Sequence, residues 1–294
     1  MSLAALFVLC RFVHFMAVML MFGVSVFTAI LSSDRFALTL QQRLQPLLAS
    51  STLVAAFSAV GLLSIQAGIM GDGWADTYQF PVWGLVLGTR FGQVWQWHLA
   101  LSFISILLLF FNRKSYFSAL MVACSSLLLA SLAFIGHAAM HDGIIGWIHQ
   151  SNQILHLFSA GYWFGSLLPL LVCLPYTRNS QHKPAAIHTL IRFSSWGHLA
   201  VVLVVVTGMI NSFIILRGWP LDFTSTYQRL LWCKIVLVVL MIIIAVINRY
   251  RVVPAIRHLP EKAHYWLVMN AWFEVVLGAA VLLLVSTFAT FEPV

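Results

Sequence analysis

Charged residues are scarce in this sequence: Asp, Glu, Lys and Arg make up 8% of its 294 residues, whereas 61% are hydrophobic. A soluble domain carries about 25% charged residues, so the composition excludes a soluble globular fold. A helix needs about 20 consecutive apolar residues to cross a bilayer, and the sequence contains eight such runs. We therefore predict an all-α, polytopic membrane bundle of eight transmembrane helices, forming a single transmembrane domain over residues 1–294 with no soluble domain. The predicted spans are about 3–31, 46–69, 93–111, 116–136, 148–174, 188–216, 228–250 and 263–290.

Cysteine is rare, and its distribution excludes a disulfide framework. The four cysteines fall in four different apolar runs, and no CxxC pair occurs; they are Cys10, Cys124, Cys173 and Cys233. We interpret most of them as small buried apolar residues.

Catalytic signatures are also missing. The sequence has no nucleophile elbow, no HExxH zinc motif, no paired carboxylates in a cleft and no ATP-binding loop. We therefore predict that the protein is not an enzyme and that any transport it performs is not driven by ATP.

Acidic residues number 8 against 16 basic ones, which gives a net charge of +8. Such an excess can indicate nucleic-acid binding, but here ten of the sixteen basic residues fall in alternate connections between the apolar runs. They are Arg35, Arg43, Arg113, Lys114, Arg178, Lys183, Arg249, Arg251, Arg257 and Lys262. Because basic loops stay on the cytoplasmic side, the pattern predicts an N-out/C-out topology with the 137–147 connection also outside, which in a bacterium is the periplasm. We predict a multi-pass protein of the inner (plasma) membrane whose surroundings are the lipid bilayer and which binds no nucleic acid.

A few ionisable and sulfur-bearing side chains interrupt the apolar runs. Cys10, His14 and Met21 share one face of a helix, and His14 lies 11 residues after Leu3, about 16 Å along the axis. That depth is near the middle of a bilayer core of about 30 Å, where ionisable residues are costly and indicate function by default. We expect the residues of similar depth to converge on the bundle interior as a metal or proton pathway. These are His14, His156, His198 and Glu274, and Arg11 and Lys234 also lie inside the runs.

Two alternatives to such a pathway remain open. The intramembrane residues can form a structural polar network that hydrogen-bonds helices together. Glu274 and Lys234 can also form an ion pair with each other.

Histidine is concentrated in the stretch "GHAAMHDGIIGWIHQSNQILH" between two apolar runs, which holds His137, His141, His149 and His156. His149 and His156 are seven residues apart and so lie on one helix face. His137 ends the fourth run on the outer side, and His98 lies near the outer end of the third. We predict that these side chains collect a metal ion.

Sulfur and carboxylate groups accompany these histidines. Met140 lies beside His137 and His141, and soft thioether or thiolate ligands favour Cu(I), while imidazole suits copper, zinc, iron and nickel. Asp142 can orient an imidazole by accepting its second N–H. In the alternative interpretation His141 is a solvated loop residue and His137 bonds free carbonyls at a helix end.

Several segments together resemble the CopD/PcoD family of bacterial copper-resistance inner-membrane proteins, including its YebZ type. The matching segments are "RFVHFMAVMLMFG" (11–23), "GHAAMHDG" (136–143), "IHQSNQILHLFSAGYWFGSLLPL" (148–170), "RFSSWGH" (192–198), "LLWCKIVLVVLMIIIAVINRY" (230–250) and "FEVVLGAAVLLLVSTFATFEP" (273–293). The resemblance implies an eight-helix protein that passes copper from periplasm to cytoplasm and works with a small periplasmic copper-binding partner of the CopC type. We expect no fused CopC domain, so that a separate partner would deliver the metal. The polar positions that match the family are His14, His137, His149, His156, His198, Lys234 and Glu274, whereas His98 and His141 are less typical of it.

The leading hypothesis is a copper transporter that contributes to copper homeostasis and resistance, with Cu(I) or Cu(II) as its cargo. Copper would be collected by His137 and His149, together with His98, Met140 and His141. It would then pass to His156, His14, His198 and the face that carries Cys10 and Met21. An inside-negative potential contributes about 2.3 kcal/mol per charge per 100 mV inward, which favours uptake.

Two other functions stay open. Imidazoles at matched depth on separate helices are what bis-histidine haem ligation needs, so a membrane b-type cytochrome with haem b is one alternative. The other is a copper sensor or assembly partner that binds the metal without moving it.

Overall fold

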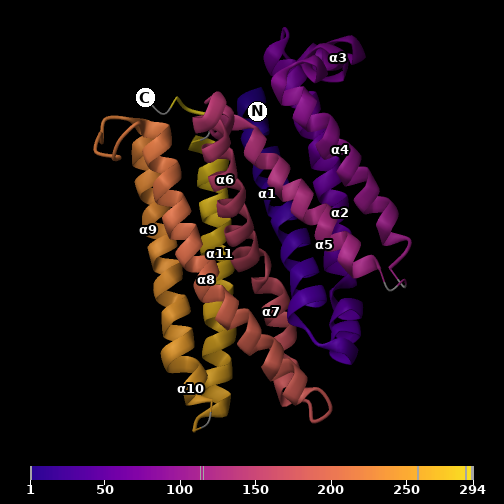
Figure 1. Cartoon of the computed structure of the whole chain (residues 1–294), viewed down its shortest axis with the longest axis vertical. Helices are drawn as coiled ribbons and strands as arrows, with labels where there is room; N and C mark the ends of the chain where they lie inside the picture. The colour runs from indigo at the N-terminus through magenta and orange to yellow at the C-terminus, as the bar shows by residue number, and fades with distance from the viewer. Residues whose placement is uncertain (1, 113, 115, 257, 289, 293–294) are drawn as a thin grey trace.

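The structure is a computed structural model that describes residues 2–112, 114, 116–256, 258–288 and 290–292, with only the backbone described at 34 and 35. Over these residues every regular element is helical, and eight helices are long and apolar enough to cross a membrane, which confirms the predicted fold class. Figure 1 shows the long helices running side by side along one common axis.

Each of the eight long helices overlaps one predicted span. They are α1 (Leu3–Val26), α2 (Asp34–Met70), α4 (Arg90–Leu109), α5 (Phe117–Ser131), α6 (Gly143–Gly165), α8 (Lys183–Leu216), α9 (Thr226–Ile247) and α11 (Pro260–Phe288). Short helices and turns extend or join them: α3 (Phe80–Gly88), α7 (Leu167–Cys173), α10 (Val253–Ala255), π turns at Phe27–Leu31 and Asn248–Val252, and 3₁₀ turns at Trp74–Tyr78, Leu132–Phe134, Gly136–Ala139 and Leu174–Arg178.

Helix α2 is longer than its predicted span, which began at residue 46. Its first turns carry an apolar residue at every fourth position, and all four are buried: Phe36, Leu40, Leu44 and Leu48. This spacing forms one stripe along a helix, so burial of the stripe holds the amphipathic segment in helical form beyond the apolar run.

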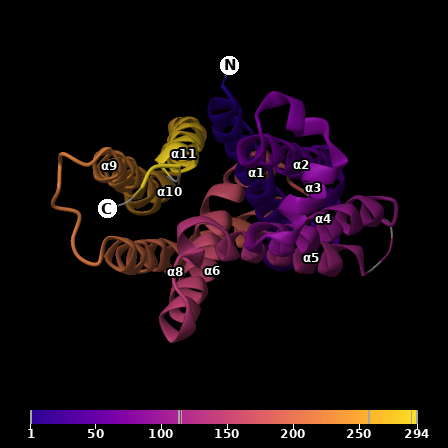
Figure 2. The ribbon, with the colours of Figure 1, turned by 90° about the horizontal axis from the view of Figure 1, so that it is seen from above.

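Helix α1 lies near the centre of the bundle. It packs against α2 and α5 on one side and against α6 and α11 on the other, while α8 packs on α6 and α9 packs on α11. Figure 2 shows the same arrangement from above, with α2 to α5 on one side of α1 and α9 to α11 on the other. Side chains on α1 and α6 can therefore connect the two halves of the molecule.

The contact between α1 and α6 depends on two glycines. A Cβ added at Gly165 would overlap the main-chain carbonyl of Met19, and one added at Gly23 would overlap the backbone of Gly165. Small residues that let two helix backbones approach closely are typical of membrane bundles, where apolar burial against lipid gives little preference for one partner.

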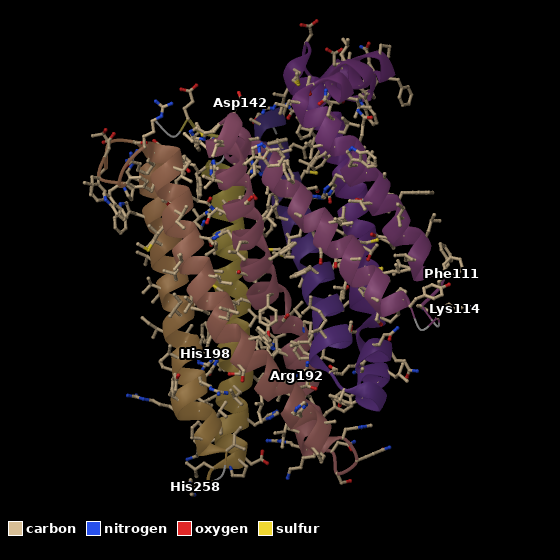
Figure 3. The ribbon with its side chains drawn as sticks, viewed as in Figure 1. Phe111, Lys114, Asp142, Arg192, His198 and His258 are labelled. Atoms are coloured by element: carbon tan, nitrogen blue, oxygen red, sulfur yellow. The ribbon has the colours of Figure 1, made fainter. Side chains whose placement is uncertain are left out.

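Both chain termini lie at the same end of the bundle, as an even number of crossings requires (Figure 1). Asp142 and α3 also lie at this end, which we call the terminal end, while His258 and α10 lie at the opposite end (Figures 1 and 3). The histidine-rich connection between α5 and α6 is therefore at the terminal end.

Candidate metal-binding sites

The connection between α5 and α6 gathers three histidines at the terminal end. Gly136, the first residue of the 3₁₀ turn Gly136–Ala139, has a φ of +67°, and Gly143, at the start of α6, has a φ of +65°. Both values lie in the left-handed region that favours glycine, and they turn the chain back over the first turns of α6. We call the residues brought together in this way, His137, His141 and His149, the terminal histidine cluster.

Two rings of this cluster are in contact, and several nitrogens of the three residues have no described hydrogen-bond partner. The centroids of the His141 and His149 rings are 5.6 Å apart, and His149 is fully buried. The buried nitrogens without a described partner are Nε2 of His137, Nδ1 of His141 and both ring nitrogens of His149. Buried polar atoms are normally satisfied, so these imidazole nitrogens are an exception, and no described residue supplies their partner.

The electrostatics of the cluster keep His137 neutral. Burial lowers the pKa of its imidazole, and the guanidinium of Arg11 lowers that pKa further, while a hydrogen bond from the ring to the backbone carbonyl of Phe291 acts in the opposite direction. A neutral imidazole is the form that binds a metal ion. His137 is therefore ready to act as a ligand at neutral pH.

The surroundings of the cluster differ from those expected from the sequence for Asp142, Met140 and His141. The carboxylate of Asp142 accepts a hydrogen bond from Arg90 at 2.7 Å, in an exposed ion pair, so it does not orient an imidazole. Met140 is exposed. The alternative of a solvated loop residue does not fit His141, because its Nδ1 is buried.

A second pair of imidazoles lies inside the bundle. His14 on α1 and His98 on α4 are both fully buried, and their ring centroids are 4.9 Å apart. Neither Nε2 atom has a described hydrogen-bond partner. We call these two residues the buried histidine pair. The expectation that His98 joins the terminal cluster is therefore wrong, since the packing of α4 turns its ring toward α1 instead.

Hydrogen bonds assign the protonated nitrogen of His14. Its Nδ1 lies 3.2 Å from the carbonyl oxygen of Ala55 and 2.9 Å from Oγ of Ser58. A carbonyl oxygen can only accept, so Nδ1 carries the hydrogen and Nε2 carries the lone pair.

The same reasoning holds for His98. The hydroxyl of Ser131 donates to the carbonyl of Leu128 at 2.8 Å, and Nδ1 of His98 lies 2.7 Å from that hydroxyl oxygen. Since the hydroxyl hydrogen is already engaged, the ring N–H donates to Ser131 and Nε2 keeps its lone pair. Two lone-pair nitrogens therefore lie in one buried site with no described donor beside them, which is an arrangement that favours a cation.

Trp95 and Cys10 complete the surroundings of the pair. The Trp95 ring stacks on His98, with centroids 4.6 Å apart and planes 7° apart, and its Nε1 donates to the carbonyl of Ala59 at 2.9 Å. The thiol of Cys10 lies 3.5 Å from the carbonyl of Ser58, so it shares a neighbour with His14, as their predicted common face requires. Met21, two turns further along α1, is fully buried.

His156 on α6 follows the same pattern as the buried pair. Its Nδ1 lies 2.9 Å from Oγ1 of Thr207 on α8, and the hydroxyl of Thr207 donates to the carbonyl of Leu203. The ring N–H therefore donates to Thr207, and Nε2 carries the lone pair. Beside it, Asn152 donates to the side-chain oxygen of Asn211 at 2.8 Å, so part of this region is the structural polar network considered above.

No closed coordination cage is present. Over the residues described, no three His, Cys, Asp or Glu side chains converge in an arrangement that would hold a metal ion. The chain instead presents imidazole nitrogens in separate groups at different depths.

Comparison with known proteins decides which family this arrangement belongs to. Residues 1–147 match the family model described as Copper resistance protein D-like, N-terminal domain, and residues 187–288 match the model described as Copper resistance protein D. The chain is 34% identical over 291 residues to the inner membrane protein YebZ of Escherichia coli (strain K12), covering 99% of each chain. The chain belongs to the copper resistance protein D family.

Two further relatives extend the comparison. Copper resistance protein D of Pseudomonas syringae pv. tomato is 30% identical over 250 residues, covering 82% of this chain and 80% of the relative. Copper transport protein CutJ of Bacillus subtilis (strain 168) is 30% identical over 214 residues, covering 67% of this chain and 38% of the relative. No solved structure matches. As a member of the copper resistance protein D family with eight membrane-spanning helices, the chain is a multi-pass protein of the inner membrane.

The two regions of this chain that match the family models contain most of the candidate ligands. The buried pair and two members of the terminal cluster lie within the first matched region, and Thr207 lies within the second. His149 and His156 lie in the part of the chain between the two matched regions.

His198 does not join the other intramembrane histidines, so its predicted convergence with His14 and His156 is wrong. Its side chain is exposed on α8, in the half of the bundle away from Asp142 (Figure 3). Its Nδ1 bonds the carbonyl of Ser194 at 2.8 Å, within its own helix, and its Nε2 lies 3.5 Å from the hydroxyl of Tyr250.

Three charged residues of the predicted set remain, and Glu274 and Lys234 are not paired with each other. Glu274 is buried and accepts hydrogen bonds from Trp163 and Asn248, so the alternative of an ion pair with Lys234 is wrong. Arg11 is half-buried, with its guanidinium carbon 5.4 Å from the centroid of the Phe15 ring.

The geometry also bears on the haem alternative. Bis-histidine haem ligation needs two imidazoles on opposite sides of the haem plane. The rings of His14 and His98 are already in contact, and His156 and His198 face different surroundings. Among the described histidines, the predicted pairing for a haem is not formed.

Sequence reasoning missed the residues that hold the imidazoles in place, namely Ser58, Ser131, Thr207 and Trp95. Three of them are hydroxyl residues inside apolar runs, which is the one signal that could have drawn attention to them.

Proposed function

We propose that this protein binds copper at the terminal end through the terminal histidine cluster and moves it into the membrane interior through the buried histidine pair and His156. The observation that carries the proposal is the shared hydrogen-bonding pattern of the three interior rings. Each donates its Nδ1–H to a hydroxyl or carbonyl and keeps a lone pair on Nε2. Metal-binding histidines are typically oriented in this way by a bond from the other ring nitrogen.

Copper is the cargo that these donors favour. Imidazole binds copper readily, and the thioether of Met21 and the thiol of Cys10 on the same face of α1 add soft donors that favour Cu(I). Relatives of this chain carry the names copper resistance protein D and copper transport protein CutJ, which supports the same choice.

Incomplete ligand sets suit a transporter better than a storage site. An ion must bind well enough to enter but weakly enough to leave, and sites with several moderate ligands in succession allow this. The separate imidazole groups at the terminal end and in the interior provide such a succession.

We propose that the terminal end faces the periplasm, because basic residues are concentrated in the connections at the opposite end. Copper would then be received from the periplasm, from a separate copper-binding partner of the CopC type. An inside-negative potential drives a cation inward by about 2.3 kcal/mol per charge per 100 mV. Uptake toward the cytoplasm is therefore the proposed direction.

Copper uptake into proteoliposomes tests the proposal. The purified protein is reconstituted with a copper-sensitive dye inside the vesicles, and an inside-negative potential is imposed. We expect uptake by the wild type and at least a tenfold loss for His149→Gln, with wild-type rates for His198→Gln, which makes the same chemical change at an exposed position.

Two outcomes would count against the proposed function. Copper that binds to the purified protein but never enters vesicles would identify a sensor or assembly partner. Purified protein that contains haem and shows its Soret absorption band, with no bound copper, would identify a cytochrome.

A further inference from the structure

Glu274 on α11 is a buried carboxyl group held by neutral donors. Its Oε2 accepts a hydrogen bond from Nε1 of Trp163 at 3.1 Å, and its Oε1 accepts one from Nδ2 of Asn248 at 3.2 Å. The ion pairs found among the described residues join Arg90 to Asp142 and Arg178 to Glu261, and neither includes Glu274. A buried carboxylate with no cation beside it is costly inside a membrane protein, so this group needs either a proton or another positive charge.

The amides beside Glu274 can accommodate both its charged and its neutral form. Nδ2 of Asn270 donates to Oδ1 of Asn248 at 2.6 Å, which continues the chain of hydrogen bonds from the carboxylate. An amide presents a donor on one side and an acceptor on the other, so turning both amides over lets Asn248 accept a hydrogen bond from a protonated Glu274. The bond from Trp163 can remain in both states.

The hydrogen bonds from Glu274 through Asn248 to Asn270 lead away from the terminal end. Helix α11 begins at Pro260, close to α10, and runs toward the C-terminus at the terminal end. Asn270 precedes Glu274 by four residues, which places it about 6 Å nearer the α10 end. A proton that leaves Glu274 through Asn248 and Asn270 therefore moves toward that end.

Helix α6 connects Glu274 to the proposed copper ligands. His149, His156 and Trp163 follow one another at intervals of seven residues, so they lie along one slowly drifting face of the helix. His149 belongs to the terminal cluster, His156 bonds Thr207, and Trp163 bonds Glu274. Trp163 lies about 10 Å beyond His156 along the axis.

We infer that Glu274 is the proton-binding site of this protein, neutral in the copper-free chain and deprotonated when copper is bound on the α6 face near His156. The inference rests on the proposed copper function and deepens it by adding a proton. In this step the carboxyl O–H bond breaks, its electron pair stays on the oxygen, and the proton passes to solvent at the α10 end. The positive charge of copper replaces that of the proton, so the interior keeps its net charge.

The size of the coupling is set by electrostatics. A unit charge at about 10 Å, the axial separation of His156 and Trp163, changes the proton affinity of a carboxylate by roughly one order of magnitude at an effective dielectric constant of about 20. That change is enough for copper binding to release a substantial part of a proton at a suitable pH.

The described hydrogen bonds of the other ionisable groups on the elements around α11 go to partners other than Glu274. Arg249 donates to Oγ of Ser194 at 3.0 Å, and the hydroxyl of Tyr162 donates to the carbonyl of Phe193 at 3.0 Å. Lys234 lies on α9, 14 residues before Asn248, so about 21 Å of helix axis separate these two residues. The remaining ionisable groups on these elements are Cys10, Arg11 and His14 on α1, His149 and His156 on α6, Cys173 on α7, Tyr227, Arg229 and Cys233 on α9, and Tyr250 and Arg251 after it. On α11 itself they are Glu261, Lys262, His264 and Tyr265.

Infrared difference spectroscopy tests the inference. Purified protein in detergent is measured before and after loading with Cu(I), and a pH-indicator dye in weakly buffered solution measures proton release. Metal analysis of the same samples gives bound copper per chain. We expect copper loading to remove the C=O band of a protonated carboxyl and to release a proton.

Two variants and a label assign the signal. Glu274→Gln keeps the size of the side chain and, at saturating Cu(I), is expected to bind the same amount of copper per chain, with neither the band nor the proton release. Because coupling is reciprocal, its copper affinity should fall by up to about tenfold. Glu261→Gln makes the same change on the same helix at an exposed position and should behave like the wild type. The chain contains three glutamates, of which Glu261 and Glu292 are exposed. A shift of the band in wild-type protein labelled with carbon-13 glutamate therefore assigns it even if the Gln variant does not fold.

The possible results separate the inference from the proposed function. Copper binding with no change in the glutamate band, or with equal proton release from Glu274→Gln, would overturn the role of Glu274 and leave copper transport standing. A wild type that binds no copper would overturn both.

Discussion

The imidazole rings of His14 and His98 lie 4.9 Å apart inside the bundle, and Nδ1 of each is bonded to a serine hydroxyl. Because both ring hydrogens are engaged, both Nε2 atoms keep their lone pairs, and neither has a described partner. Packing two such nitrogens together in an apolar interior has a cost. Binding a cation between α1 and α4 would offset that cost.

Replacing Ser131 with Ala tests whether this orientation matters. The change removes no proposed ligand but frees the His98 ring to turn, and loss of such orienting bonds typically weakens metal binding by about 10- to 100-fold. We expect that loss for Cu(I) in a competition titration against a coloured chelator. Ser126→Ala, on a different face of the same helix, is the matched control. Equal affinities for the two variants would show that Ser131 does not position a ligand.

The guanidinium of Arg11 should affect the pH dependence of copper binding at the terminal cluster. Arg11 lowers the pKa of His137, an effect second to burial, so Arg11→Gln should raise that pKa. Protons then compete with copper at a higher pH, closer to the ordinary histidine value of about 6.5. NMR titration of ring-labelled histidines, with His137→Gln to assign the signal, measures the shift. Arg43→Gln, at an exposed position, should leave the signal unchanged. A pKa that stays constant or falls in Arg11→Gln would contradict the electrostatic account.

The close approach of α1 and α6 predicts a stability effect. Gly165→Ala places a methyl group against the carbonyl of Met19, and overpacking of this kind costs about 1–3 kcal/mol. We expect a lower thermal unfolding temperature in detergent. Gly197→Ala on α8 is the control, because a Cβ there meets open space and alanine favours a helix. If Gly165→Ala is as stable as this control, the two helices do not depend on the glycine contact.

Hydropathy predicted the number and the approximate bounds of the membrane helices because the bilayer demands long apolar runs. It placed His14 in the interior, and the interval of seven residues correctly put His149 and His156 on one helix face. Those features depend on depth and on the period of a single helix, both of which are local properties of the sequence.

The partners of the histidines could not be predicted in the same way. Helix α8 is apolar around most of its circumference, so its sequence does not show which side faces the bundle, and His198 turned out to face outward. His98 meets His14 because α2 lies against both α1 and α4. The bend that carries His137 and His141 back over α6 depends on two glycines with positive φ, whose effect on the path of the chain is visible only in three dimensions.

X-ray absorption at the copper edge, combined with metal analysis, tests the central claim most directly. Wild-type protein loaded with Cu(I) should show imidazole scattering around copper. The double variant His14→Gln/His98→Gln should lose about one copper per chain and part of that imidazole signal, while His198→Gln keeps both. If the double variant binds as much copper as the wild type with the same spectrum, the buried histidine pair is not a copper site.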